Sequence, residues 1–188
     1  MKVADDIPDP AAADSIARGW DEWMAELPGV DPRVEAARRR LAGLGRLLEI
    51  GLEEIAARHG FTLGDWDALS ALQRSGTPYE RSPKELAEAV GVTSGTMSVR
   101  IGRLSGAGLV ERASDRADGR SRPIRLTAEG SQRWRVATAE RTELESALIG
   151  SAVGASELEQ LNRLLAQVLA VFEEKLGDAP VRGPIQRA

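Results

Sequence analysis

The sequence predicts a mainly α-helical fold with one small β-hairpin, organised as a winged helix-turn-helix between long helices. Two short helical patterns, over residues 82–90 and 94–108, are joined by the three-residue turn "GVT". Two strand patterns follow, and they flank Asp118 and Gly119, a dipeptide typical of tight hairpin turns. Two helices, a short turn and a hairpin, in this order, are typical of a winged helix-turn-helix.

The composition is that of one domain with extensions. The chain has 188 residues, and 42% of them are hydrophobic, which is enough for a core. It has no cysteine and a single histidine, so disulfides, thiol redox switches and thiolate metal sites are excluded. We expect no cofactor and no metal.

The N-terminal stretch "MKVADDIPDPAAAD" lacks the apolar segment of a signal peptide, and no apolar run approaches the length of a membrane span. These features predict a cytoplasmic protein with no membrane partner.

Charge is unevenly distributed along the chain, whose total is −4. Residues 81–135 contain eleven lysines and arginines against six acidic residues, a net of +5. The remaining residues contain fourteen against twenty-three, a net of −9. A basic module between acidic flanks indicates a local contact with a polyanion.

The N-terminal part predicts two helices. Residues 14–29 form a short amphipathic pattern, capped by Asp14 or Ser15 and ended by a Pro-Gly pair. Residues 31–60 form a long pattern with Asp31 as the N-cap, Pro32 in the first turn and apolar residues every three or four positions.

The helices of the central module begin at clear caps. Residues 62–76 start with Thr62, toward which Asp65 reaches back, and residues 82–90 start with a Ser82 and Glu85 capping box. The predicted helix over 94–108 ends at Gly108. The stretch "TPYE" (77–80) between the first two helices predicts a loop, and residues 109–113 and 122–127 predict the hairpin strands.

Two further long helices are predicted over residues 127–149 and 156–176, capped by Thr127 and Ser156. The apolar stripes of residues 33–59 and 156–176 exceed what one small winged helix can cover, which predicts a dimer. The predicted segments are a loose tail (1–12), an N-terminal extension and dimerisation helix (13–60), the winged helix-turn-helix (61–127), C-terminal dimerisation helices (128–177) and a second loose tail (178–188).

The helix over residues 94–108 has one face suited to the major groove of DNA. Met97, Ile101 and Leu104 share the opposite, inward face by periodicity. Around the hairpin tip lie three arginines, which phosphates would attract. The predicted DNA-binding residues are Ser94, Thr96, Ser98, Val99, Arg103, Arg116, Arg120 and Arg122. The alternative is that the hydroxyls are simply solvated, that the helix glycines have no role, and that some wing arginines pair with Asp115 or Asp118.

The stretch "SPKELAEAVGVTSGTMSVRIGRLSGAGLVERASDRADGRSRPIRLTAEG" resembles the winged-helix core of the MarR family of bacterial regulators. "GLVER", "DRADGR" and "LTAEG" are its most specific pieces, and the flanking helices resemble the family's dimerisation helices. The resemblance implies a homodimer that binds a near-palindromic operator in double-stranded DNA, most often as a repressor.

The N-terminal helix with its tryptophans, "ELPGVDP", "GDWDALSAL" and "GTPY" are similar to the urate-responsive branch of that family. The resemblance implies an effector pocket at Trp20, Asp67, Arg100 and Arg112, and Trp23 matches almost as well as Trp20. The implied ligand is a small anion: urate, another purine or an organic acid. In this interpretation, Asp67 holds Arg100 in the free protein, and an arriving anion competes for that arginine.

Periodicity favours only part of this pocket. Arg100 lies near the inward face of its helix, which supports an inward-pointing side chain. Asp67 lies off the apolar arc of its helix, so an ordinary surface carboxylate is the alternative. Arg112 closes the first hairpin strand and is equally consistent with an exposed arginine.

An enzyme is a poor fit to this sequence, because it contains no nucleophile–base pair, metal cluster or phosphate-binding loop. Two non-enzymatic interpretations stay open beside the regulator: a winged helix without ligand response, and one that contacts another protein in place of DNA. The arginine-rich hairpin argues against the latter, and a steep weakening of binding with salt would distinguish DNA from a protein partner.

Overall fold

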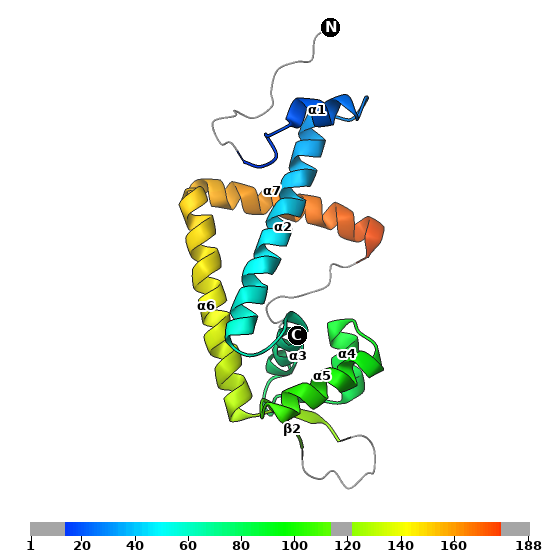
Figure 1. Cartoon of the computed structure of the whole chain (residues 1–188), viewed down its shortest axis with the longest axis vertical. Helices are drawn as coiled ribbons and strands as arrows, with labels where there is room; N and C mark the ends of the chain where they lie inside the picture. Colours follow the sequence, from blue (N-terminus) through cyan, green and yellow to red (C-terminus); the bar gives the residue numbers. More distant parts are fainter. Residues whose placement is uncertain (1–13, 114–121, 178–188) are drawn as a thin grey trace. The chain divides into compact units, whose positions relative to one another are not determined.

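The structure, a computed structural model, describes residues 14–113 and 122–177 (Figure 1). Within these ranges it is mainly helical, with a small three-stranded antiparallel sheet, which confirms the predicted fold class. The chain divides into two compact units, Met1–Gly51 and Leu52–Ala188. Each unit is considered by itself below.

The first unit contains α1 (Trp20–Ala25) and most of α2 (Pro32–Arg58). The prediction of a helix over residues 14–29 was wrong in its extent. Gly19 adopts a left-handed conformation with a φ of 68°, and the residues before it form turns, so the helix starts at Trp20. The α2 helix begins at the predicted proline and its last residue is two positions before Gly60, whose φ is 77°.

The second unit is built around α3 (Leu63–Arg74), α4 (Pro83–Val90) and α5 (Ser94–Gly106). Both predicted capping boxes are confirmed: Thr62 with Asp65 begins α3, and Ser82 with Glu85 begins α4. The bonds from Ser82 hold the pKa of Glu85 below its usual value. The three helices pack around an aliphatic core that includes Leu69, Leu72, Leu86, Met97, Ile101, Leu104 and Leu109.

The sheet consists of β1 (Glu80–Arg81), β2 (Val110–Arg112) and β3 (Ile124–Leu126), in the order β1-β3-β2. The hairpin strands β2 and β3 were predicted, but β1 lies where the sequence predicted only a loop. Glu80 pairs with Arg125 across the strands, and their side chains form an ion pair of 3.0 Å. A two-residue strand is too short for a periodic signal, so it forms only where β3 offers an open edge.

The long helices α6 (Ala128–Ala152) and α7 (Ala155–Leu176) follow the sheet. Thr127 caps α6 as predicted, by accepting the Gly130 amide. The Ser156 cap was wrong: α7 starts one residue earlier, and the Glu157 carboxylate accepts the Gly154 amide at 2.8 Å. Among the described residues, no helix is both long enough and apolar enough to cross a membrane.

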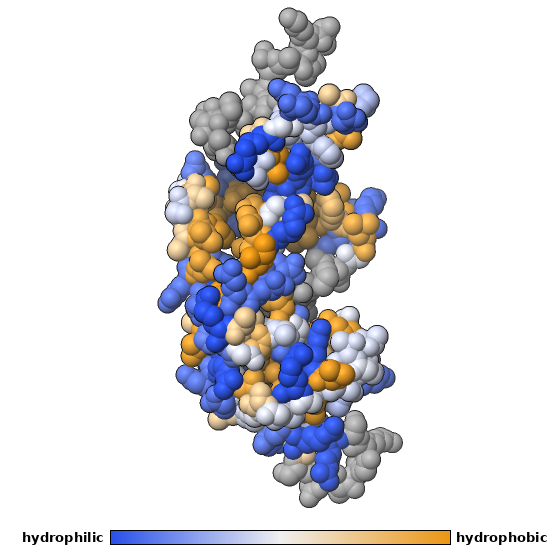
Figure 2. All heavy atoms as spheres, in the orientation of Figure 1, coloured by the Kyte–Doolittle hydropathy of each residue, from blue (hydrophilic) through white to orange (hydrophobic). Residues whose placement is uncertain are grey.

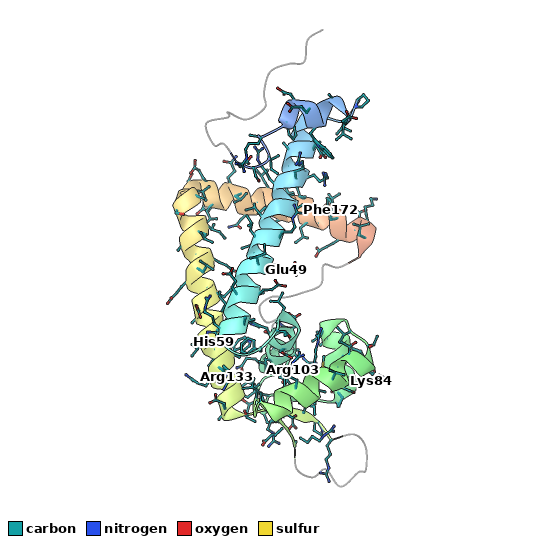
Figure 3. All side chains as sticks on the ribbon, in the orientation of Figure 1. Glu49, His59, Lys84, Arg103, Arg133 and Phe172 are labelled. Carbon is teal, nitrogen blue, oxygen red and sulfur yellow. The ribbon has the colours of Figure 1, made fainter. Side chains whose placement is uncertain are left out.

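Two contacts fix the start and middle of α6 within its unit. A Cβ atom at Gly130 would lie 2.0 Å from the Leu109 carbonyl oxygen, so only glycine allows this close approach of α6 to Leu109, the residue before β2. Farther along, Glu140 binds His59 Nε2 at 2.8 Å and also pairs with Arg58, and these contacts lower the pKa of Glu140. Figure 3 labels His59 beside α6.

Candidate nucleic-acid interface

The α5 helix divides into a packed face and an open face. Met97, Ile101 and Leu104 are at most 5% exposed, as periodicity predicted. On the open face Val99 is 69% exposed, although it is an apolar, β-branched residue in a helix. The contrast shows that packing within this chain explains one side of α5 only.

The open face is lined by small side chains. A Cβ atom at Gly102 or Gly106 would meet nothing within 4 Å, so the chain's own packing does not require glycine there. Gly102, in the helix interior, costs about 1 kcal/mol relative to alanine. The open face of α5 therefore lacks bulky side chains. No contact among the described residues compensates for the helix stability that this loses.

Hydroxyl groups occupy the N-terminal half of the same face. The Thr93 and Thr96 hydroxyl oxygens lie 3.0 Å apart, and Thr93 caps the helix by accepting the Thr96 amide. Ser98 donates its hydroxyl to the Ser94 carbonyl at 2.9 Å. These side chains are exposed and short, and each hydroxyl oxygen can still accept a hydrogen bond from outside the helix.

Arg103 ties α5 to the beginning of α3 (Figure 3). Its Nε donates to Asp65 Oδ2 at 3.0 Å, and its Nη2 donates to Asp65 Oδ1 at 2.5 Å. The same Nη2 also reaches the Thr62 hydroxyl at 3.1 Å. Asp65 is 1% exposed, whereas the Arg103 side chain is 49% exposed. A bidentate pair with a buried carboxylate makes Arg103 an orienting residue, which its predicted role in DNA contact did not anticipate.

Arg100 makes a second link between the same two helices. Its Nη1 donates to the Gly64 carbonyl at 3.3 Å. A Cβ atom at Gly64 would lie only 2.4 Å from Arg100 Cζ, so the guanidinium rests directly on the glycine. The inward orientation that the sequence indicated for Arg100 thus brings it to the first turn of α3.

The hairpin carries the remaining predicted residues. Arg112 is exposed on β2 opposite Ile124, and Arg122 is exposed just before β3. Arg116 and Arg120, with the predicted hairpin turn, lie outside the described residues.

Comparison with known proteins identifies this arrangement. Residues 59–121, from just before α3 through α5 and β2 into the hairpin, match the MarR family. A MarR family domain therefore spans residues 59–121 of the chain. One curated relative, the HTH-type transcriptional regulator PecS of Dickeya dadantii (strain 3937), is 29% identical over 109 residues. That match covers 58% of this chain and 66% of PecS, slightly less than two thirds of its length.

Several solved structures share the fold. YusO from Bacillus subtilis has a TM-score of 0.64 at 21% identity and covers 74% of this chain and 96% of its own. AbsC, a MarR family transcriptional regulator from Streptomyces coelicolor, has a TM-score of 0.62 at 21% identity and covers 78% and 98%. PecS and AbsC are named as transcriptional regulators, in agreement with the prediction that the chain is not an enzyme.

The residues of the predicted effector pocket fall in both units. Trp20 is buried in the first unit, with 8% exposure. Asp67 is half-buried on α3, two residues from the carboxylate that binds Arg103. Burial lowers the pKa of Arg74, and the charge of Asp67 opposes that shift. The hydrogen bond that the structure shows for Arg100 goes to Gly64, not to Asp67.

Asp65 has a second role that the sequence did not indicate, as the partner of Arg103. The capping box identified its bonds to Thr62, and these are present, with Asp65 Oδ2 accepting the Thr62 amide at 2.9 Å. A carboxylate has lone pairs left after such a cap. Asp65 and Arg103 are 38 residues apart, so no local sequence pattern indicated that Arg103 would donate to the Asp65 carboxylate.

Proposed function

We propose that this MarR family regulator binds a near-palindromic operator in double-stranded DNA as a homodimer, in the cytoplasm. The surface that carries the proposal is the open face of α5. Its hydroxyls, its exposed valine and its glycines suit close approach to base edges, with Val99 against a thymine methyl group. Ser94, Thr96, Ser98 and Val99 are the proposed base and sugar contacts, while Arg103 orients the helix.

The homodimer is supported by the apolar side chains of α7. This 22-residue helix has no buried residue in the isolated chain. Figure 2 shows hydrophobic residues on the surface of its C-terminal half. Its exposed large hydrophobic residues are Leu161, Leu164, Leu165, Val168, Leu169, Val171, Phe172 and Leu176. A continuous apolar stripe of this length is typical of a protein interface.

The wing arginines are the proposed phosphate contacts, and a salt titration tests them. We expect Arg122→Gln and Arg120→Gln each to weaken operator binding. The slope of log K against log salt should flatten by about one unit for each phosphate partner that is removed. Binding to unrelated duplex DNA should weaken equally, because phosphates carry no sequence information. The measurement is fluorescence anisotropy over a series of salt concentrations.

Lys84→Gln is the control for that titration. Lys84 is an exposed cation on α4, and its ion pair with Glu88 is long, at 3.9 Å. Its loss should leave the slope closer to that of the wild type than either wing substitution does. If both wing variants keep the wild-type slope and affinity, the wing does not contact DNA. If binding of the wild type does not depend on salt, a role in protein contact is favoured.

We further propose that the regulator is a repressor released by a small anion such as urate, another purine or an organic acid. The position of Arg100 supports this effector site. Its guanidinium donates to one carbonyl, that of Gly64, and its other N–H groups can still bind an anion. Asp67 and Arg112 are the other proposed effector residues of this unit. Because Arg100 belongs to α5, an anion that draws it from Gly64 would shift the proposed DNA-contacting helix.

Gly64→Ala tests this mechanism without removing a charge. The added Cβ cannot coexist with the observed Arg100 position, but a flexible guanidinium can move away. We expect the unfolding free energy to change by no more than about 1 kcal/mol. Operator affinity should fall, and urate should cause a smaller further decrease than in the wild type. The coupling between the two binding sites must be reciprocal. In each variant, operator DNA should therefore weaken urate binding by the same factor by which urate weakens operator binding.

Gly102→Ala is the matched control, since its Cβ would meet nothing within 4 Å. It should preserve the response to urate even if it weakens operator binding. If neither urate nor an organic acid at millimolar concentration releases operator DNA from the wild type, the effector proposal fails while the DNA-binding proposal stands.

A further inference from the structure

The first unit contains a recess of about 230 Å³ that the proposed function does not use. It lies between the N-terminal segment and α2 and is lined by Ile16, Trp23, Arg38, Arg39, Ala42 and Arg46. Three of its six lining residues are arginines. Such a concentration of cations around one hollow requires its own explanation.

The indole of Trp23 forms an ordered wall of this recess. Its Nε1 donates to Glu35 Oε1 at 3.0 Å. Glu35 is 6% exposed and also accepts two bonds from Arg38, at 2.8 and 2.6 Å. The pKa of Glu35 is lowered to about 2, first by Arg38 and then by Trp23, so the carboxylate stays charged and keeps both partners in place. Trp23 nevertheless remains 40% exposed.

Two arginines stand at opposite ends of the recess, with a small residue between them. Arg39, Ala42 and Arg46 follow one another at spacings of three and four, so they share one face of α2. The Cα atoms of the two arginines are about 10 Å apart along the helix. The methyl group of Ala42 leaves the space between them open.

Within the described part of the chain, neither of these two arginines forms an ion pair. Arg38 is paired with Glu35, but the Arg39 guanidinium lies over the Trp23 ring, with Cζ 5.0 Å from the ring centroid. Among the residues that the structure describes, Arg46 has no hydrogen bond or ion pair. The recess thus combines an aromatic wall with two cationic ends.

We propose that this recess binds a small planar aromatic dicarboxylate. The two carboxylates would pair with Arg39 and Arg46, whose guanidinium groups suit carboxylate geometry. The aromatic body would lie over Ala42 and against Trp23, where an apolar ring removes exposed surface from water. The volume of the recess, about 230 Å³, has room for one benzene ring with its substituents.

Three of the predicted effector residues lie outside this site. Asp67, Arg100 and Arg112 belong to the second unit, whereas every residue of the recess belongs to the first. Trp20, the fourth, does not line the recess, but Trp23, its alternative in the predicted effector pocket, does. The inference goes beyond the proposed function and does not depend on it, because binding can be measured without DNA.

Calorimetric titration of the full chain with terephthalate tests the proposal. We expect saturable binding with one ligand per chain. Arg39→Gln and Arg46→Gln should each weaken binding about tenfold, the scale of a hydrogen bond between charged groups. Ala42→Leu should abolish binding, because it fills the space between the arginines while keeping a strong helix former.

The ligand set separates charge from shape. The saturated analogue, cyclohexane dicarboxylate, keeps both charges but lacks the planar ring, and we expect it to bind several-fold more weakly than terephthalate. Trp23→Leu should remove that preference. Terephthalamide keeps the ring without the charges and should not bind measurably.

Arg33→Gln is the matched control, since it removes one positive charge from α2 outside the recess; Arg33 pairs with Asp31. It should bind terephthalate like the wild type, and circular dichroism should show that all variants are folded. The proposal is overturned by the absence of saturable binding at millimolar terephthalate, or by Arg46→Gln and Ala42→Leu variants that bind as tightly as the wild type. The site proposed here is also refuted if Asp67→Asn or Arg100→Gln loses terephthalate binding while the recess variants bind like the wild type. That result would indicate that the ligand binds in the second unit.

Discussion

Replacing Asp65 by alanine is expected to lower the free energy of unfolding by about 3 kcal/mol. The substitution removes the capping box of α3, worth about 1 kcal/mol, together with the bidentate partner of Arg103. Because the Arg103 side chain is half exposed, its guanidinium can regain water, which limits the additional loss to about 2 kcal/mol. Operator binding should weaken as well, since α5 loses its firmest link to α3. Urea denaturation at a fixed protein concentration measures the first effect, and anisotropy measures the second.

Glu88→Ala provides the reference for an exposed carboxylate. Glu88 is 65% exposed in its contact with Lys84, so we expect a change within about 0.5 kcal/mol. A double-mutant cycle with Asp65→Ala and Arg103→Met then isolates the coupling between the two side chains. If Asp65→Ala proves no more destabilising than Glu88→Ala, the clamp between α3 and α5 does not contribute to stability.

Phe172→Glu is expected to convert the proposed homodimer into monomers at micromolar concentration and to reduce affinity for the proposed operator at least about a hundredfold. Phe172, labelled on α7 in Figure 3, is 57% exposed in the isolated chain and lies on the same face as Leu165 and Val168. A carboxylate placed in an apolar interface loses hydration without gaining a partner, which costs several kcal/mol across two symmetric copies. Loss of the dimer also removes simultaneous binding to both halves of an operator.

Ala170→Glu adds the same charge to the opposite side of α7 and should leave both the dimer and operator binding intact. Sedimentation velocity gives the oligomeric state of each variant, and circular dichroism shows whether the helices persist. A wild-type chain that sediments as a monomer, or a Phe172→Glu variant that stays dimeric, would place the dimer interface elsewhere or remove it.

Local signals in the sequence determined most of the secondary structure. The Thr62–Asp65 and Ser82–Glu85 boxes mark the starts of α3 and α4, and both are present as expected. The periodicity of α5 identified its buried face from three residues alone. These features depend on residues three or four positions apart, which share a helix turn whatever the rest of the chain does. The helix-turn-helix, and with it the resemblance to the MarR family, was therefore evident from local patterns.

Contacts between distant residues were decided only by the tertiary structure. The short strand β1 exists because β3 offers it a free edge, and Ser156 does not cap α7 because the Glu157 carboxylate already meets the Gly154 amide. The sequence predicted Arg103 only as a DNA contact, and the fold alone shows that its guanidinium pairs with Asp65. Likewise, both N-terminal tryptophans matched the expected pattern, and burial alone separates Trp20, inside its unit, from Trp23, at the recess. An arginine or a tryptophan has several chemically equivalent partners in any sequence, and the packing of the chain determines which one is within reach.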